Sequence, residues 1–227
     1  MEVILIKAYI FDLDNTLHDR FGAYEKYSVD FLNRYFPNNS KDDFAIKYND
    51  MIQYDNNGYS NRLSVFSKLI AKWNWTEGPT PDTLVNDYYA EFYKLVYFTP
   101  NMENVLQTLK AKGYMLGIIT NGPQTQHNKI DILGIRSLFD IIVVSNEVGV
   151  EKPGKEIFNI ACQQLNILNE EACYVGDHFT NDVIGATNAG LRAIWYTYRG
   201  YPKKIEKALI PLNTLVIEDI NELIELI

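Results

Sequence analysis

The stretch that decides the fold is Val3-Ile4-Leu5-Ile6-Lys7-Ala8-Tyr9-Ile10-Phe11, followed directly by Asp12-Leu13-Asp14-Asn15-Thr16. The first part is almost continuously apolar and rich in β-branched residues, a pattern typical of a strand covered on both faces in a parallel sheet. The second part places two carboxylates just past the strand, where open α/β sheets bind their ligands. We therefore predict a parallel sheet with a polar site at the carboxyl end of its first strand.

Shorter apolar runs repeat the strand pattern at 114–120, 141–145, 172–175, 193–196 and 214–217. Amphipathic stretches of helical spacing lie between them, at 102–112, 130–133, 154–165 and 182–189. Pro153 suits the start of the third of these helices, and Gly190 suits the end of the fourth. The acidic stretch 217–227 predicts a last helix that covers the sheet. Strands alternating with helices indicate a doubly wound, mostly parallel α/β fold.

The segment 17–98 breaks this alternation. It contains no convincing buried strand, and its apolar residues recur at three- and four-residue spacings, as in Tyr24, Tyr27, Phe31 and Tyr35. It holds 19 of the chain's 30 aromatic residues in 82 of its 227 positions, a concentration that indicates a packed helical unit of its own. We predict an α/β core formed by 1–16 and 99–227, with 17–98 inserted as a helical domain.

Composition narrows the classes of protein. Apolar residues at 47% and charged residues at 22% exclude a disordered chain and a collagen-like fibre. The net charge of −8 provides no general attraction to nucleic acid or to an anionic membrane. No apolar run approaches the roughly 20 residues that span a bilayer. Two cysteines, Cys162 and Cys173, are too few for a disulfide framework, so we expect buried thiols, a reducing compartment and a cytoplasmic location.

Polar residues gather just past several predicted strands. The carboxyl ends of parallel strands share one edge of a sheet, so these residues should converge on a single site. The clusters are Asp12-Leu13-Asp14, Thr120-Asn121-Gly122, Lys152-Pro153, and Gly176-Asp177 with Asp182.

The residue types in these clusters suit phosphoryl transfer. Asp12 and Asp14 leave a strand two residues apart and start on the same face, so a cation between them would allow both to ionise. With Asp177 they form a set of hard oxygen ligands of the kind that Mg²⁺ prefers. Thr120, the two backbone amides after it and the Lys152 ammonium could hold the remaining oxygens of a phosphoryl group. Charge neutralisation would then perform most of the catalysis.

Each cluster also has a purely structural interpretation. Asp12 and Asp14 suit a turn before a helix, and Thr120-Asn121-Gly122 suits a turn by itself. Helix capping explains one of Asp177 and Asp182, but not both. The occurrence of all four clusters in order at successive strand ends favours the catalytic interpretation.

These four ordered clusters resemble the motifs of the haloacid dehalogenase-like phosphatases, and the helical insertion lies where the first-type cap of that family lies. The segments 117–122, 145–153 and 186–191 are also similar to the pyrimidine 5′-nucleotidases and acylneuraminate-9-phosphatases. The resemblance spans nearly the whole chain. It implies an Mg²⁺-dependent phosphatase that acts on a small phosphorylated metabolite through an aspartyl-phosphate, with nucleoside monophosphates among the candidate substrates.

The resemblance also implies roles for the residues that act on the phosphoryl group. Asp12 would be the nucleophile, and Asp14 would act first as general acid and then as general base. Thr120, with Asn121 and Gly122, would bind the phosphoryl oxygens. Lys152 would stabilise their charge and position Asp12.

The metal ligands follow from the same resemblance. Asp177 would bind Mg²⁺ together with Asp12 and the backbone carbonyl of Asp14, and Asp182 would support the site through water or Lys152. The dehalogenase branch of the family lacks the second aspartate, so the presence of Asp14 favours a phosphatase.

Two other functions remain open. One is a phosphomutase of the same architecture, which returns the phosphoryl group to a sugar. The other is a non-catalytic module that binds a phosphorylated ligand. Such a module would be expected to lack some of the charged side chains that catalysis needs. All five of the charged and hydroxyl side chains of the constellation are nevertheless present, namely Asp12, Asp14, Thr120, Lys152 and Asp177.

Several further residues are candidates for substrate contacts. His18 lies at the start of the insertion, and His178 follows Asp177 directly, whereas His127 suits a polar helix position. The insertion's aromatic residues mainly indicate packing between helices. Three of them are also candidates for stacking on a nucleobase, namely Tyr24, Tyr54 and Trp73.

Overall fold

The computed structural model describes residues 5–199, 205, 209–212 and 214–225, which form two compact units. The core unit is Met1–Asp19 with Phe98–Ile227, and the cap unit is Arg20–Tyr97. The two connecting segments pair with each other inside the core unit. The Thr99 amide donates to Leu17 O at 3.0 Å, and the Thr99 hydroxyl donates to Thr16 O at 2.6 Å. The observed division therefore lies at Asp19 and Phe98, whereas the sequence pattern placed it at 16 and 99.

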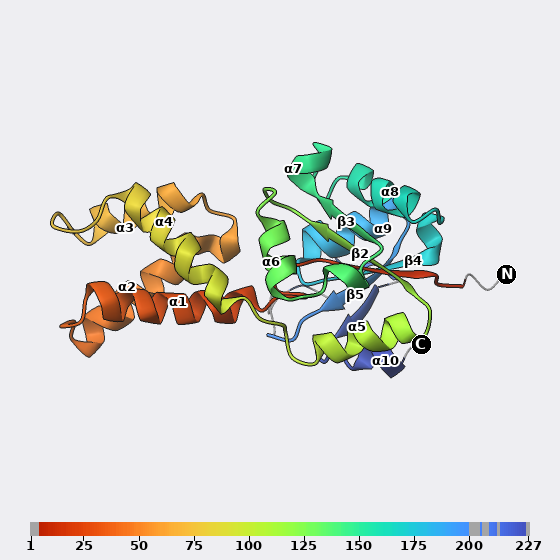
Figure 1. Ribbon diagram of the computed structural model, residues 1–227, viewed down its shortest axis with the longest axis horizontal. Coiled ribbons are helices and arrows are strands. Elements are labelled where there is room, and N and C mark those ends of the chain that lie inside the picture. Colours follow the sequence, from red (N-terminus) through yellow and green to blue (C-terminus); the bar gives the residue numbers. More distant parts are fainter. Residues whose placement is uncertain (1–4, 200–204, 206–208, 213, 226–227) are drawn as a thin grey trace. The chain divides into compact units, whose positions relative to one another are not determined.

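The core unit is built on a six-stranded sheet with the strand order β3-β2-β1-β4-β5-β6 (Figure 1). All neighbouring strands are parallel, and Ala8 of β1 lies opposite both Met115 and Ala172. The prediction of a doubly wound parallel sheet is confirmed. The strands are β1 (Ala8–Phe11), β2 (Met115–Thr120), β3 (Ile141–Val144), β4 (Ala172–Gly176), β5 (Arg192–Tyr196) and β6 (Thr214–Ile217).

Helices cover both faces of this sheet. Side chains alternate along β1, so that Phe11 faces one layer and Ile10 the other. The Phe11 face is covered by α5 (Met102–Ala111) and α10 (Glu222–Glu225), and the opposite face by α8 (Lys155–Gln164) and α9 (Gly185–Ala189) (Figure 1). Cys162 and Cys173 are buried free thiols in these two layers, as predicted.

Several predicted boundaries are wrong by a few residues. The first strand begins at Ala8 rather than Val3, because Leu5 is exposed and pairing with β2 starts at Ala8; residues 3 and 4 lie outside the described part. The short helix predicted at 130–133 is α6 (Gln126–Ile132), which starts with a polar turn. The helix predicted at 182–189 begins as a π-helical turn, Phe179–Ile184, before α9. In the predicted helix 217–227, only Glu222–Glu225 is helical among the residues described.

The cap unit consists of four main helices, α1 (Arg20–Tyr35), α2 (Lys41–Asp55), α3 (Arg62–Lys72) and α4 (Pro81–Phe92). Ser40, Asn61 and Thr80 each accept a hydrogen bond from the first turn of the helix they precede, and Pro81 occupies a first-turn position. Buried aromatic residues such as Tyr27 and Phe31 fill the space between the helices. No helix in the described part of the chain is long and apolar enough to cross a membrane.

Short helices complete both units. Those of the cap unit are the 3₁₀ turns Asn56–Gly58 and Tyr93–Leu95. Those of the core unit are α7 (Ser145–Val148) and the 3₁₀ turns Arg136–Leu138 and Asn169–Glu171.

A buried ionic group lies inside the cap unit. The Arg20 guanidinium donates to both Asp55 oxygens at 2.7 and 2.8 Å, and Arg62 lies 2.6 Å from the same carboxylate. Burial alone would raise the pKa of Asp55, but the two guanidinium groups hold it below its usual value. Arg62 also lies over the rings of Tyr24 and Tyr88. The negative charge of Asp55 is therefore fully compensated within the cap.

Candidate functional site

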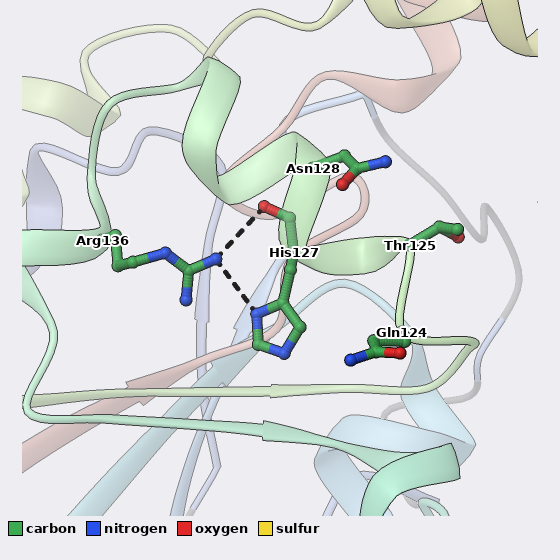
Figure 2. Close-up of a pocket in the computed structure, with 5 residues that line it drawn as sticks. All are labelled: Gln124, Thr125, His127, Asn128 and Arg136. Carbon is green, nitrogen blue, oxygen red and sulfur yellow. Dashed lines mark hydrogen bonds between the residues drawn. The ribbon is translucent and has the colours of Figure 1, made fainter.

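An open pocket of about 430 Å³ lies on the core unit beside the loop that follows β2 (Figure 2). Arg136 donates to His127 Nδ1 at 3.2 Å, and His127 Nε2 lies 3.1 Å from Glu147. His127 is therefore a polar residue of α6, as predicted. The pocket contains none of the predicted catalytic residues. Its lining is Gln124, Thr125, His127, Asn128 and Arg136.

The predicted catalytic residues instead meet at the carboxyl ends of β1, β2 and β4. Asp12 directly follows β1, Thr120 ends β2 and Asp177 directly follows β4. The strand order reverses between β1 and β4, because β2 lies on one side of β1 and β4 on the other. A crevice at such a switch point is where open α/β sheets bind ligands.

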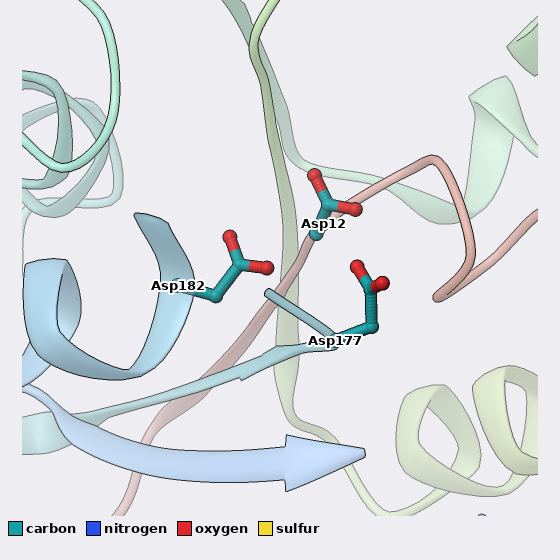
Figure 3. Close-up of side chains that lie close together, drawn as sticks. All are labelled: Asp12, Asp177 and Asp182. Carbon is teal, nitrogen blue, oxygen red and sulfur yellow. The ribbon is translucent and has the colours of Figure 1, made fainter. Parts of the chain in front are cut away.

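Three carboxylates form a compact acidic cluster at this point. Asp12, Asp177 and Asp182 each offer an oxygen, and these oxygens lie within 4.8 Å of one another (Figure 3). Asp12 and Asp182 are buried, and Asp177 is half-buried. The Asp14 side chain is not part of this cluster. A metal contact through the backbone carbonyl of Asp14 stays a prediction.

The Lys152 ammonium lies at the centre of the buried contacts. It donates to Asp12 Oδ1 at 2.6 Å, to Asp182 Oδ1 at 2.7 Å and to the Tyr174 hydroxyl at 2.7 Å. Its side chain is only 3% exposed, so these three contacts must replace water. Lys152 thus connects Asp12 to Asp182, and the predicted support of a metal site by Asp182, through water or through Lys152, stays a prediction.

Asp182 is held from its other side by the turn that follows β4. Its Oδ2 accepts the His178 amide at 2.8 Å. A side chain at Gly176 would place its Cβ 2.5 Å from the Asp182 carboxyl group, so only glycine leaves room for this aspartate. Both oxygens of Asp182 are therefore occupied by protein donors.

The electrostatics of the cluster favour the binding of a cation. Burial raises the pKa of Asp12 to about 7 in spite of Lys152, and burial together with the Asp12 charge raises that of Asp177 well above its usual range. Burial alone would lower the pKa of Lys152, but Asp12 and Asp182 raise it well above its usual value. One ammonium is thus set against three carboxylates. A small divalent cation fits this set of oxygen donors, because it allows Asp12 and Asp177 to ionise together.

The loop after β2 is joined to Lys152 by its asparagine. The Asn121 side chain donates to Lys152 O and accepts the Lys152 amide, both at 2.9 Å. The Gly122 amide donates to Ser145 Oγ at 2.9 Å. Asn121 thus positions the lysine, and the amide of Gly122 is engaged by Ser145 in this state rather than turned toward the acidic cluster.

Asp14 is held by two residues of α6 that sequence reasoning did not identify. Lys129 Nζ lies 2.7 Å from each Asp14 oxygen, and Gln126 Nε2 donates to Asp14 Oδ2 at 3.0 Å and to Thr120 Oγ1 at 2.7 Å. Both precede the apolar residues at 130–133 from which the helix was predicted. Lys129 is therefore one cation beside Asp14, and a metal ion between Asp12 and Asp14 stays a prediction.

The two other candidate histidines lie in the core unit. His178 Nδ1 accepts the Asn181 amide at 3.1 Å and caps the turn that follows β4. His18 is fully buried, and the backbone around it pairs with Asp14 and Phe98. A substrate contact by either histidine stays a prediction.

The three aromatic candidates pack within the cap, but only Tyr24 is fully buried, whereas Tyr54 and Trp73 are half-buried. Tyr24 is 2% exposed and donates its hydroxyl to Met51 O at 3.3 Å. Trp73 donates to Asp50 Oδ2 at 2.9 Å, and Lys72 lies over the ring of Tyr54. Tyr24 has too little exposed surface to stack on a nucleobase.

Comparison with known proteins places the chain among hydrolases. A family model described as haloacid dehalogenase-like hydrolase matches residues 9–196. A glyceraldehyde 3-phosphate phosphatase of Methanothermobacter thermautotrophicus is 32% identical, covering 98% of this chain and all of the relative. The pyrimidine 5′-nucleotidase YjjG of Escherichia coli is 29% identical, covering 82% of this chain and 83% of the relative.

A solved structure shows the same fold. The HAD-hydrolase YfnB of Bacillus subtilis, in its magnesium-bound orthorhombic form, is 23% identical and has a TM-score of 0.75. The match covers 98% of each chain, so it includes the residues of both units.

Proposed function

Because the chain belongs to the haloacid dehalogenase-like hydrolases and is a phosphoric monoester hydrolase, we propose an Mg²⁺-dependent phosphatase that forms an aspartyl-phosphate on Asp12. The observation that carries this proposal is the buried contact between Asp12 and Lys152 beside Asp177, at the point where the strand order reverses. A carboxylate in this place is fixed by a lysine and faces the edge where substrates bind.

In the first half-reaction, an oxygen of Asp12 attacks the phosphorus of the substrate. The bond from phosphorus to the alcohol oxygen breaks, and its electron pair stays on that oxygen. Asp14, which is protonated at the start of this half-reaction, gives its proton to the alcohol oxygen, so that a neutral alcohol leaves and Asp14 becomes a carboxylate. Thr120 binds the phosphoryl oxygens, and the Lys152 ammonium beside Asp12 stabilises their negative charge.

In the second half-reaction, Asp14 accepts a proton from water as the water oxygen attacks phosphorus. The bond between phosphorus and Asp12 breaks, and its electron pair returns to the carboxylate. Inorganic phosphate leaves, and both aspartates regain their starting states. The net reaction consumes one water for each phosphomonoester.

The metal would be held by Asp12, Asp177 and the backbone carbonyl of Asp14. When bound, Mg²⁺ supplies positive charge to the carboxylates and to the phosphoryl oxygens. Asp182 is committed to Lys152, Tyr174 and the amide of His178, so it supports the site through the lysine.

For the substrate, we propose a small phosphorylated metabolite, with triose phosphates and pyrimidine nucleoside monophosphates as the two classes to separate. The relative named for glyceraldehyde 3-phosphate is similar over 98% of this chain, cap unit included, which favours the first class. The nucleotidase relative supports the second over 82% of the chain.

Phosphate release from a substrate panel tests the proposal. The panel contains glyceraldehyde 3-phosphate, pyrimidine nucleoside monophosphates, hexose phosphates and phosphoglycolate, each with Mg²⁺ and with a chelator. We expect release only with Mg²⁺, and a loss of at least about a thousandfold in Asp12→Asn. The matched control is Asp131→Asn, which removes an exposed carboxylate paired with Arg136 and should leave turnover unchanged. Normal turnover of Asp12→Asn at saturating Mg²⁺ would refute the mechanism.

The phosphomutase alternative makes a different prediction. A mutase requires a bisphosphate activator, keeps the phosphoryl group on the enzyme and releases little inorganic phosphate. Stoichiometric phosphate release without a bisphosphate would exclude it.

A further inference from the structure

Helix α6 carries two buried polar side chains on one face. Gln126 and Lys129 are three residues apart, so they lie side by side on the helix, and they are only 5% and 9% exposed. Their neighbours His127 and Asn128 line the open pocket of Figure 2 instead. A lysine is rarely buried without a specific partner, and here the partner is Asp14.

Lys129 engages the whole Asp14 carboxylate. Its ammonium lies 2.7 Å from both oxygens, and the Asp14 side chain is 25% exposed. Gln126 adds a third contact to the same carboxylate and extends to the Thr120 hydroxyl. The orientation of Asp14 is therefore determined by α6, a helix more than a hundred residues further along the chain.

This orientation matters because proton transfer requires close geometry. A general acid or base must lie within hydrogen-bond reach of the atom with which it exchanges a proton. A carboxylate at a loop position can rotate about its side-chain bonds, and small displacements of a reacting group cost large factors in rate. Two donors from a packed helix remove that freedom.

We propose that Lys129 is a positioning residue of the reaction, which holds the Asp14 carboxylate where it exchanges protons with the leaving alcohol and with water. Gln126 assists by connecting that carboxylate to the Thr120 hydroxyl. The inference rests on the proposed function, in which Asp14 is the acid and base. In this role Lys129 acts through Asp14.

The test compares Lys129→Met, Asp14→Asn and the double variant. With an alkyl phosphate that the wild type hydrolyses, Lys129→Met should lower kcat about 10- to 100-fold and change KM less than threefold. The expected loss in kcat is a part of the 10²- to 10⁴-fold rate increase that a general acid contributes. In the Asp14→Asn background, the same substitution should change kcat less than twofold. Lys129→Arg, which keeps a cation in place, should recover part of the lost rate.

Two controls separate positioning from a general loss of structure. Lys110→Met removes an exposed lysine of the same unit, paired with Asp140, and should leave kcat unchanged. Thermal unfolding of each variant shows whether the core unit is intact. A folding defect in Lys129→Met would lower the rate in the Asp14→Asn background as well, and that outcome would overturn the inference.

Other outcomes have equally definite meanings. A large rise in KM with unchanged kcat would make Lys129 a substrate ligand and would also overturn the inference. If Asp14→Asn is impaired while Lys129→Met is normal, the inference fails and the proposed function stands. If Asp14→Asn turns over normally, the acid–base assignment in the proposed function fails, and the inference fails with it.

Discussion

The core and cap units both bury charged side chains, but they balance them in opposite ways. In the core, Lys152 is set against Asp12, Asp177 and Asp182, and the pKa values of Asp12 and Asp177 are raised. In the cap, Arg20 and Arg62 share Asp55, and its pKa is lowered. In the core cluster one ammonium group faces three carboxylates, whereas in the cap two guanidinium groups face the single carboxylate of Asp55.

This difference distinguishes a site from a scaffold. A carboxylate with a lowered pKa and saturated contacts is already satisfied, so the Asp55 group holds helices together. Carboxylates with raised pKa values, gathered at a strand end, are poised to receive a cation or a phosphoryl group. The contrast predicts that substitutions of buried charge affect rate in the core and folding in the cap.

The largest effect should come from the core lysine. Lys152→Met removes the cation that fixes Asp12 and that is proposed to neutralise the phosphoryl oxygens, so turnover at saturating substrate should fall about a thousandfold. Lys155→Met, an exposed lysine three residues later, is the matched control. Steady-state phosphate release measures both. Turnover within tenfold of the wild type would mean that the buried charges of the core are structural, like those of the cap.

The next largest effect should be a loss of stability in the cap. Asp55→Asn leaves two buried guanidinium groups without their counterion, and breaking such a group typically costs about 3–5 kcal/mol. Hydrogen exchange followed by mass spectrometry should show faster exchange in α1 and α3, with protection of β1 and β4 unchanged. Equal loss of protection in both units would show that the two do not separate as the comparison requires.

Much of the core site was predictable from sequence because its parts follow local rules. Buried parallel strands appear in the sequence as apolar runs, and their carboxyl ends lie at one edge of the sheet. Asp12 and Asp177 could therefore be predicted to lie close together without knowledge of any contact. The Lys152 contact with Tyr174 could not, because Tyr174 reads as one more apolar residue of a buried strand. Its hydroxyl acquires a role only once α8 and β4 are packed.

The partners of Asp14 and Asp55 could not be predicted from the sequence pattern, for a different reason. Lys129 lies 115 residues from Asp14, and Arg20 lies 35 residues from Asp55. Such pairs depend on where a helix begins and on the angle at which it packs, and neither has a short-range signal. The helix was predicted from its apolar residues at 130–133, and polar residues before them, such as Gln126 and Lys129, carry no signal of their partners.

A third prediction uses pH to separate the units. Asp12 has a folded pKa of about 7 and an unfolded pKa near 3.9, so between these values the folded state binds more protons than the unfolded state. With a chelator present, the stability of the core should therefore fall by about 3 kcal/mol as pH rises from about 4 to about 7.

The cap should respond in the opposite direction. The pKa of Asp55 is lowered, so its stabilisation is present above about pH 4 and is lost as the pH falls through its folded pKa. Urea unfolding followed by hydrogen exchange in each unit measures both slopes. Asp12→Asn should reduce the slope of unfolding free energy against pH in the core and leave that slope unchanged in the cap. Slopes of the same sign in both units would contradict the comparison.

The smallest effects should come from exposed ion pairs, where the two units should behave alike. Lys110 pairs with Asp140 at 2.7 Å in the core, and Arg34 pairs with Asp87 at 2.8 Å in the cap, with both basic side chains more than a third exposed. Water and salt screen such charges and the side chains lose entropy on pairing, so each is worth about 0–1 kcal/mol. Lys110→Met and Arg34→Met should therefore shift the unfolding free energy of their units by less than about 1 kcal/mol in urea titrations, and less again at high salt. A cost as large as that of Asp55→Asn for either one would mean that the contrast between the units arises from their overall charge. Small and equal costs would mean that the contrast between the units arises from the few carboxylates that each unit buries.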